Sequence, residues 1–133
     1  MKVDVNDRLF SQLKRQNQVQ CQMCLKETKT LQCCHIFSRR FYSTRFDPLN
    51  AVCLCYSCHQ WFDTHKIQAC LFDMSKRVFD GRDESFHFLI ERLGYTWHGI
   101  LRLYHKSQQP FRGYKQKKKE ISKHLKQLIE QEV

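Results

Sequence analysis

Two cysteine pairs with the same short spacing are the first residues in this sequence whose types predict chemistry. Cys21 and Cys24 form one C-x2-C pair, and Cys55 and Cys58 form another further along the chain. Four thiolates arranged in two such pairs are typical of a closed, tetrahedral zinc site. Cys53 competes with Cys55, because it also lies near Cys58, but a C-x4-C bite is less usual. The spacing therefore predicts structural Zn²⁺ on Cys21, Cys24, Cys55 and Cys58.

The segment between the two pairs is rich in arginine and in aromatic residues. Its central stretch, SRRFYSTRFDPLN, contains Arg39, Arg40 and Arg45 and has no acidic residue before Asp47. Arginine can bind phosphate through two parallel hydrogen bonds, so these side chains are candidate contacts with a DNA backbone. A lysine run near the C-terminus is either a solvated face or a second such contact. Under the second interpretation the contacts include Lys117, Lys118 and Lys119.

The net charge of the chain narrows the choice of partner. The 133 residues carry 23 Lys and Arg against 13 Asp and Glu, which gives a formal charge of +10. Such an excess suits a polyanion, because each neutralised phosphate releases condensed counterions. A basic surface that serves solubility alone is the alternative. We expect no membrane partner, because the sequence has no apolar run of about 18 residues and no large apolar face beside its basic stretches.

The cysteines also bear on the cellular compartment. The opening stretch MKVDVNDRLF lacks the apolar core of a signal peptide, so we expect a cytoplasmic protein. The cytosol keeps thiols reduced, which favours metal-bound thiolates over disulfides among the eight cysteines. Cys33, Cys53 and Cys70 are expected to be small buried hydrophobic residues, whereas the role of Cys34 is left open by the spacing.

Hydrophobic periodicity and turn residues predict the elements that position these side chains. The first part of the chain is predicted to alternate helix, strand, loop, strand and helix over residues 6–16, 28–37, 38–50, 51–55 and 55–63. Asn6 or Asp7 is the expected N-cap of the first helix. The first strand is expected to deliver His35 at or near its end. Asp47 precedes a proline and so is expected to be extended rather than helical.

The rest of the sequence is predicted to be mainly helical. Apolar stripes recur at the helical period, and they begin at Ile67, Phe86, Trp97 and Ile121. The first stripe runs to Val78 and is broken by Asp80-Gly81, and Gly94 is a fitting C-cap for the second. Residues 106–119 contain Pro110 and Gly113 and are expected to form a loop or hinge. These stripes are most simply core, with the last one available for tertiary or intersubunit packing.

The stretch from Cys21 to His65 resembles the HNH, or ββα-metal, nucleases. It is most similar to phage recombination endonucleases of the NinG/Rap and endonuclease VII type. The resemblance covers about a third of the chain and rests on Cys34-His35-Ile36, on Asn50 and on Cys55-x2-Cys58-His59. It implies an α+β fold, in which a small treble-clef-like ββα-metal zinc finger is followed by packed α-helices. One domain over 1–133 is expected, with its parts at 17–66, 67–105 and 106–133.

The resemblance also implies roles for individual residues. His35 would be the general base, because a neutral imidazole can take a proton from water at physiological pH. Asn50 would orient that ring or tie down the loop by hydrogen bonds. His59 would bind a second, catalytic divalent cation, which could be Mg²⁺, Mn²⁺ or Zn²⁺.

Cys34 departs from the family pattern, in which many members have Asp. A thiol is a poor ligand for magnesium and a good one for zinc. Either Cys34 is a bystander and His59 binds the cation with water and phosphate, or the catalytic ion is softer than magnesium. His65 is a candidate replacement ligand, and Asp63, four residues after His59, would face the same side of a helix.

These features together predict a metal-dependent DNA endonuclease. The resemblance implies branched or recombination-intermediate DNA as substrate, in a bacterial or phage-infected host cell. A two-fold dimer would fit such a substrate, with the C-terminal helix as its interface. A zinc module that only binds nucleic acid would need the cysteines and the basic residues but not His35, Asn50 and His59. A duplex-specific homing or restriction-type nuclease and an RNA nuclease are further alternatives.

Overall fold

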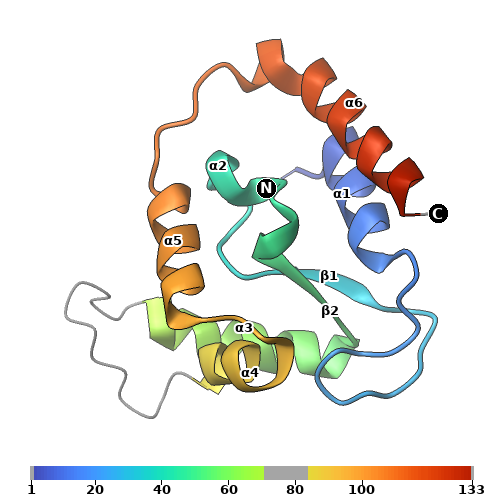
Figure 1. Ribbon diagram of the computed structural model, residues 1–133, viewed down its shortest axis with the longest axis vertical. Coiled ribbons are helices and arrows are strands. Elements are labelled where there is room, and N and C mark those ends of the chain that lie inside the picture. The colour runs from blue at the N-terminus through green and yellow to red at the C-terminus, as the bar shows by residue number, and fades with distance from the viewer. Residues whose placement is uncertain (1, 71–83, 133) are drawn as a thin grey trace.

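The computed structural model describes residues 2–70 and 84–132 and confirms an α+β architecture (Figure 1). In chain order the elements are α1 (Val5–Arg15), β1 (Gln32–His35), α2 (Tyr42–Arg45), the 3-10 turn η1 (Pro48–Asn50), β2 (Ala51–Leu54), α3 (Tyr56–Cys70), α4 (Glu84–Leu93), α5 (Trp97–Ser107) and α6 (Tyr114–Gln131). The apolar stripe predicted from Ile67 to Val78 and the break at Asp80-Gly81 lie outside the residues whose side chains are described.

A short antiparallel hairpin followed directly by a helix forms the centre of the molecule. β1 pairs with β2 in a register that places Cys34 opposite Val52 and His35 opposite Ala51. The first strand is much shorter than the predicted range of 28–37. Its length is limited by its partner, because β2 is only four residues long and the chain enters α3 at Tyr56. His35 nevertheless ends the strand, as predicted.

The helix after the hairpin is longer than the sequence predicted. The expected helix over 55–63 continues without a break to Cys70, into the start of the helix expected from Ile67, as the single element α3. No glycine or proline lies between Asp63 and Ile67, so nothing in the local sequence breaks the helix there. The loop before β2 also contains the short elements α2 and η1. Asp47 is extended, as expected before proline, and its side chain caps η1 by accepting from the Leu49 N–H.

The first helix begins earlier than predicted, because Asp4 is its N-cap rather than Asn6 or Asp7. The Asp4 side chain accepts hydrogen bonds from the N–H groups of Asn6 and Asp7, and the Asp7 side chain accepts from the Asp4 N–H. This reciprocal capping box satisfies three backbone donors at once. Asn6 is instead fully buried and donates to the Tyr114 hydroxyl and the Lys118 carbonyl, so it joins α1 to α6.

The two terminal helices pack against each other and against one face of the hairpin (Figure 1). Phe10 and Leu13 of α1, Ala51 of β2 and Leu125 of α6 are buried together. The predicted loop over 106–119 ends at Gly113, which has a φ of 77°, and the lysine run lies in the first turns of α6. The apolar stripe of α6 therefore packs on α1 within the chain, with Leu125 buried and the rest of the stripe partly exposed, and a dimer interface on α6 stays a prediction.

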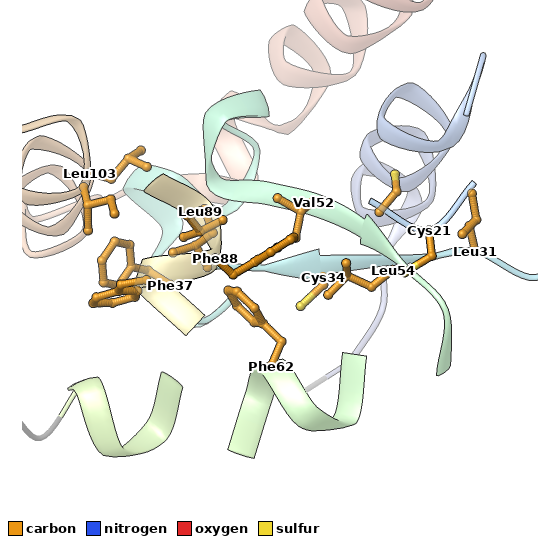
Figure 2. Packing of buried hydrophobic residues seen from close by; sticks show 14 residues of the cluster. Cys21, Leu31, Cys34, Phe37, Val52, Leu54, Phe62, Phe88, Leu89 and Leu103 are labelled. Carbon is orange, nitrogen blue, oxygen red and sulfur yellow. The ribbon is translucent and has the colours of Figure 1, made fainter. Parts of the chain in front are cut away.

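The main core lies on the other face of the hairpin, between the strands and α3, α4 and α5 (Figure 2). Phe62 of α3, Phe86 and Leu89 of α4, and Ile100 of α5 are at most 1% exposed. The Gly94 φ of 78° ends α4 as the sequence predicted. Among the described residues, no helix combines the length and the apolar character needed to cross a membrane.

Candidate active site and metal centres

The four cysteines of the two C-x2-C pairs converge on one point. The sulfur atoms of Cys21, Cys24, Cys55 and Cys58 all lie within 4.8 Å of one another, and the Sγ atoms of Cys24 and Cys55 are 3.8 Å apart. Zn–S bonds of about 2.3 Å in a tetrahedron place sulfur atoms about 3.8 Å apart, so this donor set fits zinc. The cluster would fasten the turn before the hairpin to the start of α3.

Backbone dipoles favour negative charge within this cluster. Burial alone would raise the pKa of the Cys21 thiol, but N–H groups of Cys24, Cys55 and Met23 lower it to about 6. Burial and the neighbouring sulfur atoms raise the pKa of Cys58. Like charges crowded together oppose further ionisation, and a bound cation removes that opposition. The chemistry of the site is therefore that of a metal centre.

A second group of donors lies between β1 and α3. Cys34, His59 and Asp63 place their ligand atoms within 4.8 Å of one another. His59 Nε2 is 3.2 Å from Asp63 Oδ2, and Cys34 Sγ is 3.8 Å from Asp63 Oδ1. The Cys34 sulfur points from the strand toward α3 (Figure 2). Gln32 Oε1 lies 2.7 Å from His59 Nδ1, an arrangement that directs the Nε2 lone pair toward the carboxylate. In the neutral ring, Nε2 and the Asp63 carboxylate can therefore bind one cation together.

The third candidate ligand is therefore Asp63 rather than His65. A residue four positions after His59 shares its helix face, whereas a residue six positions on points elsewhere. The His65 Nδ1 donates to the Trp61 carbonyl at 2.7 Å, and its ring stacks on the Trp61 indole. Its Nε2 lies 3.7 Å from Glu84. His65 is outside both groups of metal donors found among the described residues.

His35 is held in one tautomer by the backbone. Its Nε2 lies 2.9 Å from the Arg45 carbonyl oxygen, which can only accept, so Nε2 must carry the proton. Nδ1 then has the lone pair that a general base needs. The Phe10 ring packs beside the imidazole at 5.3 Å between centroids. The Arg45 carbonyl thus determines which nitrogen of His35 carries the proton and which carries the lone pair.

Asn50 shapes the loop and makes no direct bond to the His35 ring in the hydrogen bonds found. Its side-chain oxygen accepts from the Phe37 N–H at 2.9 Å, and its Nδ2 donates to the carbonyls of Phe37 and Thr44, both at 3.0 Å. The side chain is fully buried. Of the two roles considered from the sequence, the structure shows the loop-tying one. Because Thr44 precedes Arg45, Asn50 also positions the carbonyl that holds His35.

The three arginines of the loop have different environments, and Arg45 corrects a prediction. Its side chain is 2% exposed and binds Asp7, with Nε to Oδ1 at 2.9 Å and Nη2 to Oδ2 at 2.6 Å. It is therefore a structural residue, not a phosphate contact. Arg39 is partly exposed and lies 3.7 Å from Asp7, whereas Arg40 is exposed beside the Phe41 ring.

His35, His59 and Asp63 line one groove of about 830 Å³. β1 has only β2 as a partner among the described residues, and its other edge, with Gln32, forms the floor. His59 and Asp63 come from α3, and His35 comes from the end of β1. Three further lining residues come from α1, and no motif or spacing in the sequence marks them as functional. They are Arg8, Ser11 and Arg15.

The lysines of α6 do not line this groove. Lys117 lies 4.8 Å from the Phe111 ring centre and lines a separate hollow between α2 and α6. The Lys118 carbonyl accepts from Asn6, and Lys119 is exposed. Whether they contact DNA stays a prediction.

The geometry agrees with a comparison of the sequence with protein families. Residues 19–68 match a family model described as HNH endonuclease. The match spans both cysteine pairs, the hairpin and most of α3, so the similarity to HNH endonucleases covers the part of the chain that carries both groups of metal donors. No curated protein and no solved structure matches the chain. The comparison supports a nuclease with a zinc site and leaves its particular substrate open.

Proposed function

We propose that this protein is a metal-dependent endonuclease that hydrolyses phosphodiester bonds in DNA. One observation carries the proposal. His35, whose Nε2 is bonded to the Arg45 carbonyl, lines the same groove as His59 and Asp63, which with Cys34 form a metal-binding group. A module that only bound nucleic acid would need neither a tautomer-restricted histidine nor a second group of metal donors.

The residues of the groove divide the work of hydrolysis. His35 Nδ1 takes a proton from the attacking water, while the Arg45 carbonyl keeps the ring in place. Cys34, His59 and Asp63 would hold the divalent cation, which when bound offsets the negative charge of the phosphate and of the leaving oxygen. A set of one sulfur, one nitrogen and one oxygen donor favours a transition metal over magnesium.

The substrate in this proposal is branched or recombination-intermediate DNA, handled in the cytoplasm of a bacterial or phage-infected cell. The support is the resemblance of Cys21 to His65 to phage recombination nucleases and the basic character of the chain. The protein would act as one domain. If it acts as a two-fold dimer, the C-terminal helix α6 would supply the interface through the part of its surface that α1 leaves exposed.

Cleavage of a panel of labelled DNAs tests the proposal. The panel contains linear duplex, single strand, fork, D-loop and four-way junction, each with Mg²⁺, Mn²⁺ or Zn²⁺. We expect the intact protein to cut a branched substrate best, and His35→Ala to lose about 10²- to 10⁴-fold in rate, as expected for removal of a general base. Binding should survive, because His35 is not a main phosphate contact.

His98→Ala is the matched control, because His98 is an exposed histidine on α5, outside the groove. Its cleavage rate should equal that of the intact protein. Thermal unfolding of both variants checks that His35→Ala remains folded despite its contact with Phe10. If DNA is bound equally well by the intact protein and by His35→Ala, and neither cuts it with any metal, the binding-module alternative replaces the nuclease.

A further inference from the structure

Helix α1 has two faces with different environments. Phe10 and Leu13 point into the cluster shared with α6, where they are at most 4% exposed. Arg8, Ser11 and Arg15 follow the helical spacing of three and four residues on the opposite face, and all three line the groove that contains His35 and His59. The groove therefore has α3 as one wall and α1 as the other.

The groove continues beyond the catalytic residues in both directions. A hollow of about 630 Å³ beside the first cysteine pair shares Arg15 and Leu31 with it. A hollow of about 270 Å³ on α3 shares Gln32, His59 and Asp63 with it. The three hollows thus form one track along the edge of β1. Arg15 lies at the junction of the first two, on the far side of the site from α3.

Three acidic residues line this track, and one of them, Glu27, shares the hollow beside Arg15 with Lys29. Asp7, which also lines the groove, is already bound by Arg45, and Asp63 belongs to the metal-binding group. Within the described residues no ion pair involves Arg8 or Arg15. Arg15 Nε donates to Ser11 Oγ at 2.9 Å, which restrains the side chain and leaves its terminal nitrogens for a ligand. Two uncompensated guanidinium groups in a groove suit an anion with repeated charges.

We propose that Arg8 and Arg15 bind phosphates that flank the scissile one, on a nucleic-acid strand that lies between α1 and α3. The inference rests on the proposed nuclease function for the position of the scissile phosphate. It assigns to α1, which lies outside the matched family segment, the role of holding the strand in register with His35. Arg8 and Arg15 then replace Arg45, which is buried, as the principal phosphate contacts near the site.

The salt dependence of binding tests this proposal directly. All proteins carry His35→Ala to prevent cutting, and the probe is a fluorescein-labelled single-stranded oligonucleotide or its duplex, followed by anisotropy at several salt concentrations. Removing two phosphate contacts with Arg8→Ala/Arg15→Ala should reduce the slope of log K against log salt by about 1.4 for a single strand or about 1.8 for duplex. Affinity at low salt should fall about 10-fold or more.

A second pair of exposed arginines supplies the control. Arg102→Ala/Arg112→Ala removes the same charge from α5 and the following loop, away from the groove. It should change the slope by far less than the α1 pair. An unchanged slope in Arg8→Ala/Arg15→Ala, or an equal change in both pairs, would overturn the proposal. Both pairs are exposed, so unfolding midpoints should stay close to that of the parent and exclude misfolding.

Cleavage by proteins that retain His35 separates the two proposals. Suppose that the intact protein cuts DNA and that Arg8→Ala/Arg15→Ala raises KM more than it lowers kcat. The nuclease function and the role of α1 are then both supported. If the intact protein cuts while the α1 pair leaves KM and the salt slope unchanged, only the role of α1 fails. If nothing is cut under any metal but the slope still falls in the α1 pair, α1 binds nucleic acid and only the nuclease function fails.

Discussion

At the scale of single residues, the site depends on side chains that never touch the substrate. Asn50 binds the Thr44 carbonyl, and the next carbonyl, that of Arg45, holds Nε2 of His35. A buried amide therefore sets the tautomer of the base through the backbone. The residue whose carbonyl is used, Arg45, is itself anchored through its side chain to Asp7 of α1. The orientation of His35 thus has two supports.

The Asp7–Arg45 pair should be the most pH-sensitive contribution to stability on the acid side. Burial tends to raise the pKa of Asp7, but the bonds from Arg45 and the Asp4 N–H, together with the charges of Arg45 and Arg39, outweigh burial and hold the pKa below its ordinary value. A lowered folded-state pKa stabilises the fold above the unfolded-state value of about 3.9 and loses that effect as pH falls through the folded-state value. Asp7→Asn should therefore cost about 3 kcal/mol at pH 7, since it leaves a buried guanidinium without its counter-charge.

Urea unfolding at pH 7 and at a series of pH values below about 4 measures this difference. The gap between the intact protein and Asp7→Asn should narrow as the pH falls. Glu91→Gln is the control, because Glu91 is 71% exposed and pairs with His87 at the surface, where such pairs contribute at most about 1 kcal/mol. A gap that stayed constant down to low pH would show that the Asp7 charge does not stabilise the fold.

The sequence predicted some of these residue roles, and the reason for each outcome is physical. Spacing alone identified the four cysteines, because structural zinc sites commonly use pairs of ligands that are separated by only two residues. Spacing also pointed to Asp63, on the same helix face as His59. Arg45 could not be told from Arg39 and Arg40 in the same loop, because its partner Asp7 lies 38 positions away in the sequence. When an element far away in the sequence buries a side chain, the residues next to that side chain give no sign of the burial.

At the scale of elements, the pairing of α1 with α6 supports the groove from behind. Phe10 and Leu13 contact Leu125 on the face of α1 that is turned away from Arg8 and Arg15. Leu125→Ala should destabilise the protein by about 2–5 kcal/mol, because the side chain is fully buried and its removal leaves a cavity. Thermal or urea unfolding provides the measurement.

Lys126→Ala is the matched control for this change, because Lys126 is the exposed neighbour on the same helix. Alanine there should alter stability by no more than about 0.5 kcal/mol. Equal stability of the Leu125 variant and the Lys126 variant would contradict the packing of α6 on α1.

The elements themselves were predicted with uneven success. The order of strand, loop, strand and helix was right, because β-formers, a proline turn and a cysteine pair mark them locally. The merging of two predicted helices into α3 was missed, although no breaker separates them. The start of α1 was misplaced, because Asp4, Asn6 and Asp7 are all good capping residues. Only the reciprocal bonds of Asp4 and Asp7 distinguish them.

At the scale of the whole molecule, the four-cysteine centre should be necessary for folding. It would join the turn before β1 to the start of α3, and structural zinc sites contribute folding free energy directly. Removing zinc with a strong chelator, or replacing Cys24 by Ser, should abolish the cooperative unfolding transition. Circular dichroism and the zinc content of the purified protein measure the effect.

Cys33→Ala provides the control for zinc content, because Cys33 is a cysteine outside the cluster. The control should bind as much zinc as the intact protein at the structural site. A chelated protein that kept its native spectrum and its unfolding midpoint would show that the fold does not depend on this metal.

The packing of α1 against α6 has a consequence for the order of folding. The hairpin, the cysteine cluster and α3 are linked by contacts between segments close in sequence, whereas Asn6 and the Lys118 carbonyl are separated by 112 positions. Closing a long loop costs chain entropy before its contacts form, so contacts of this kind slow folding. We therefore expect the metal-binding unit to form first, with α1 docking last. During refolding, the chain should regain its metal centre before it regains the ability to bind nucleic acid.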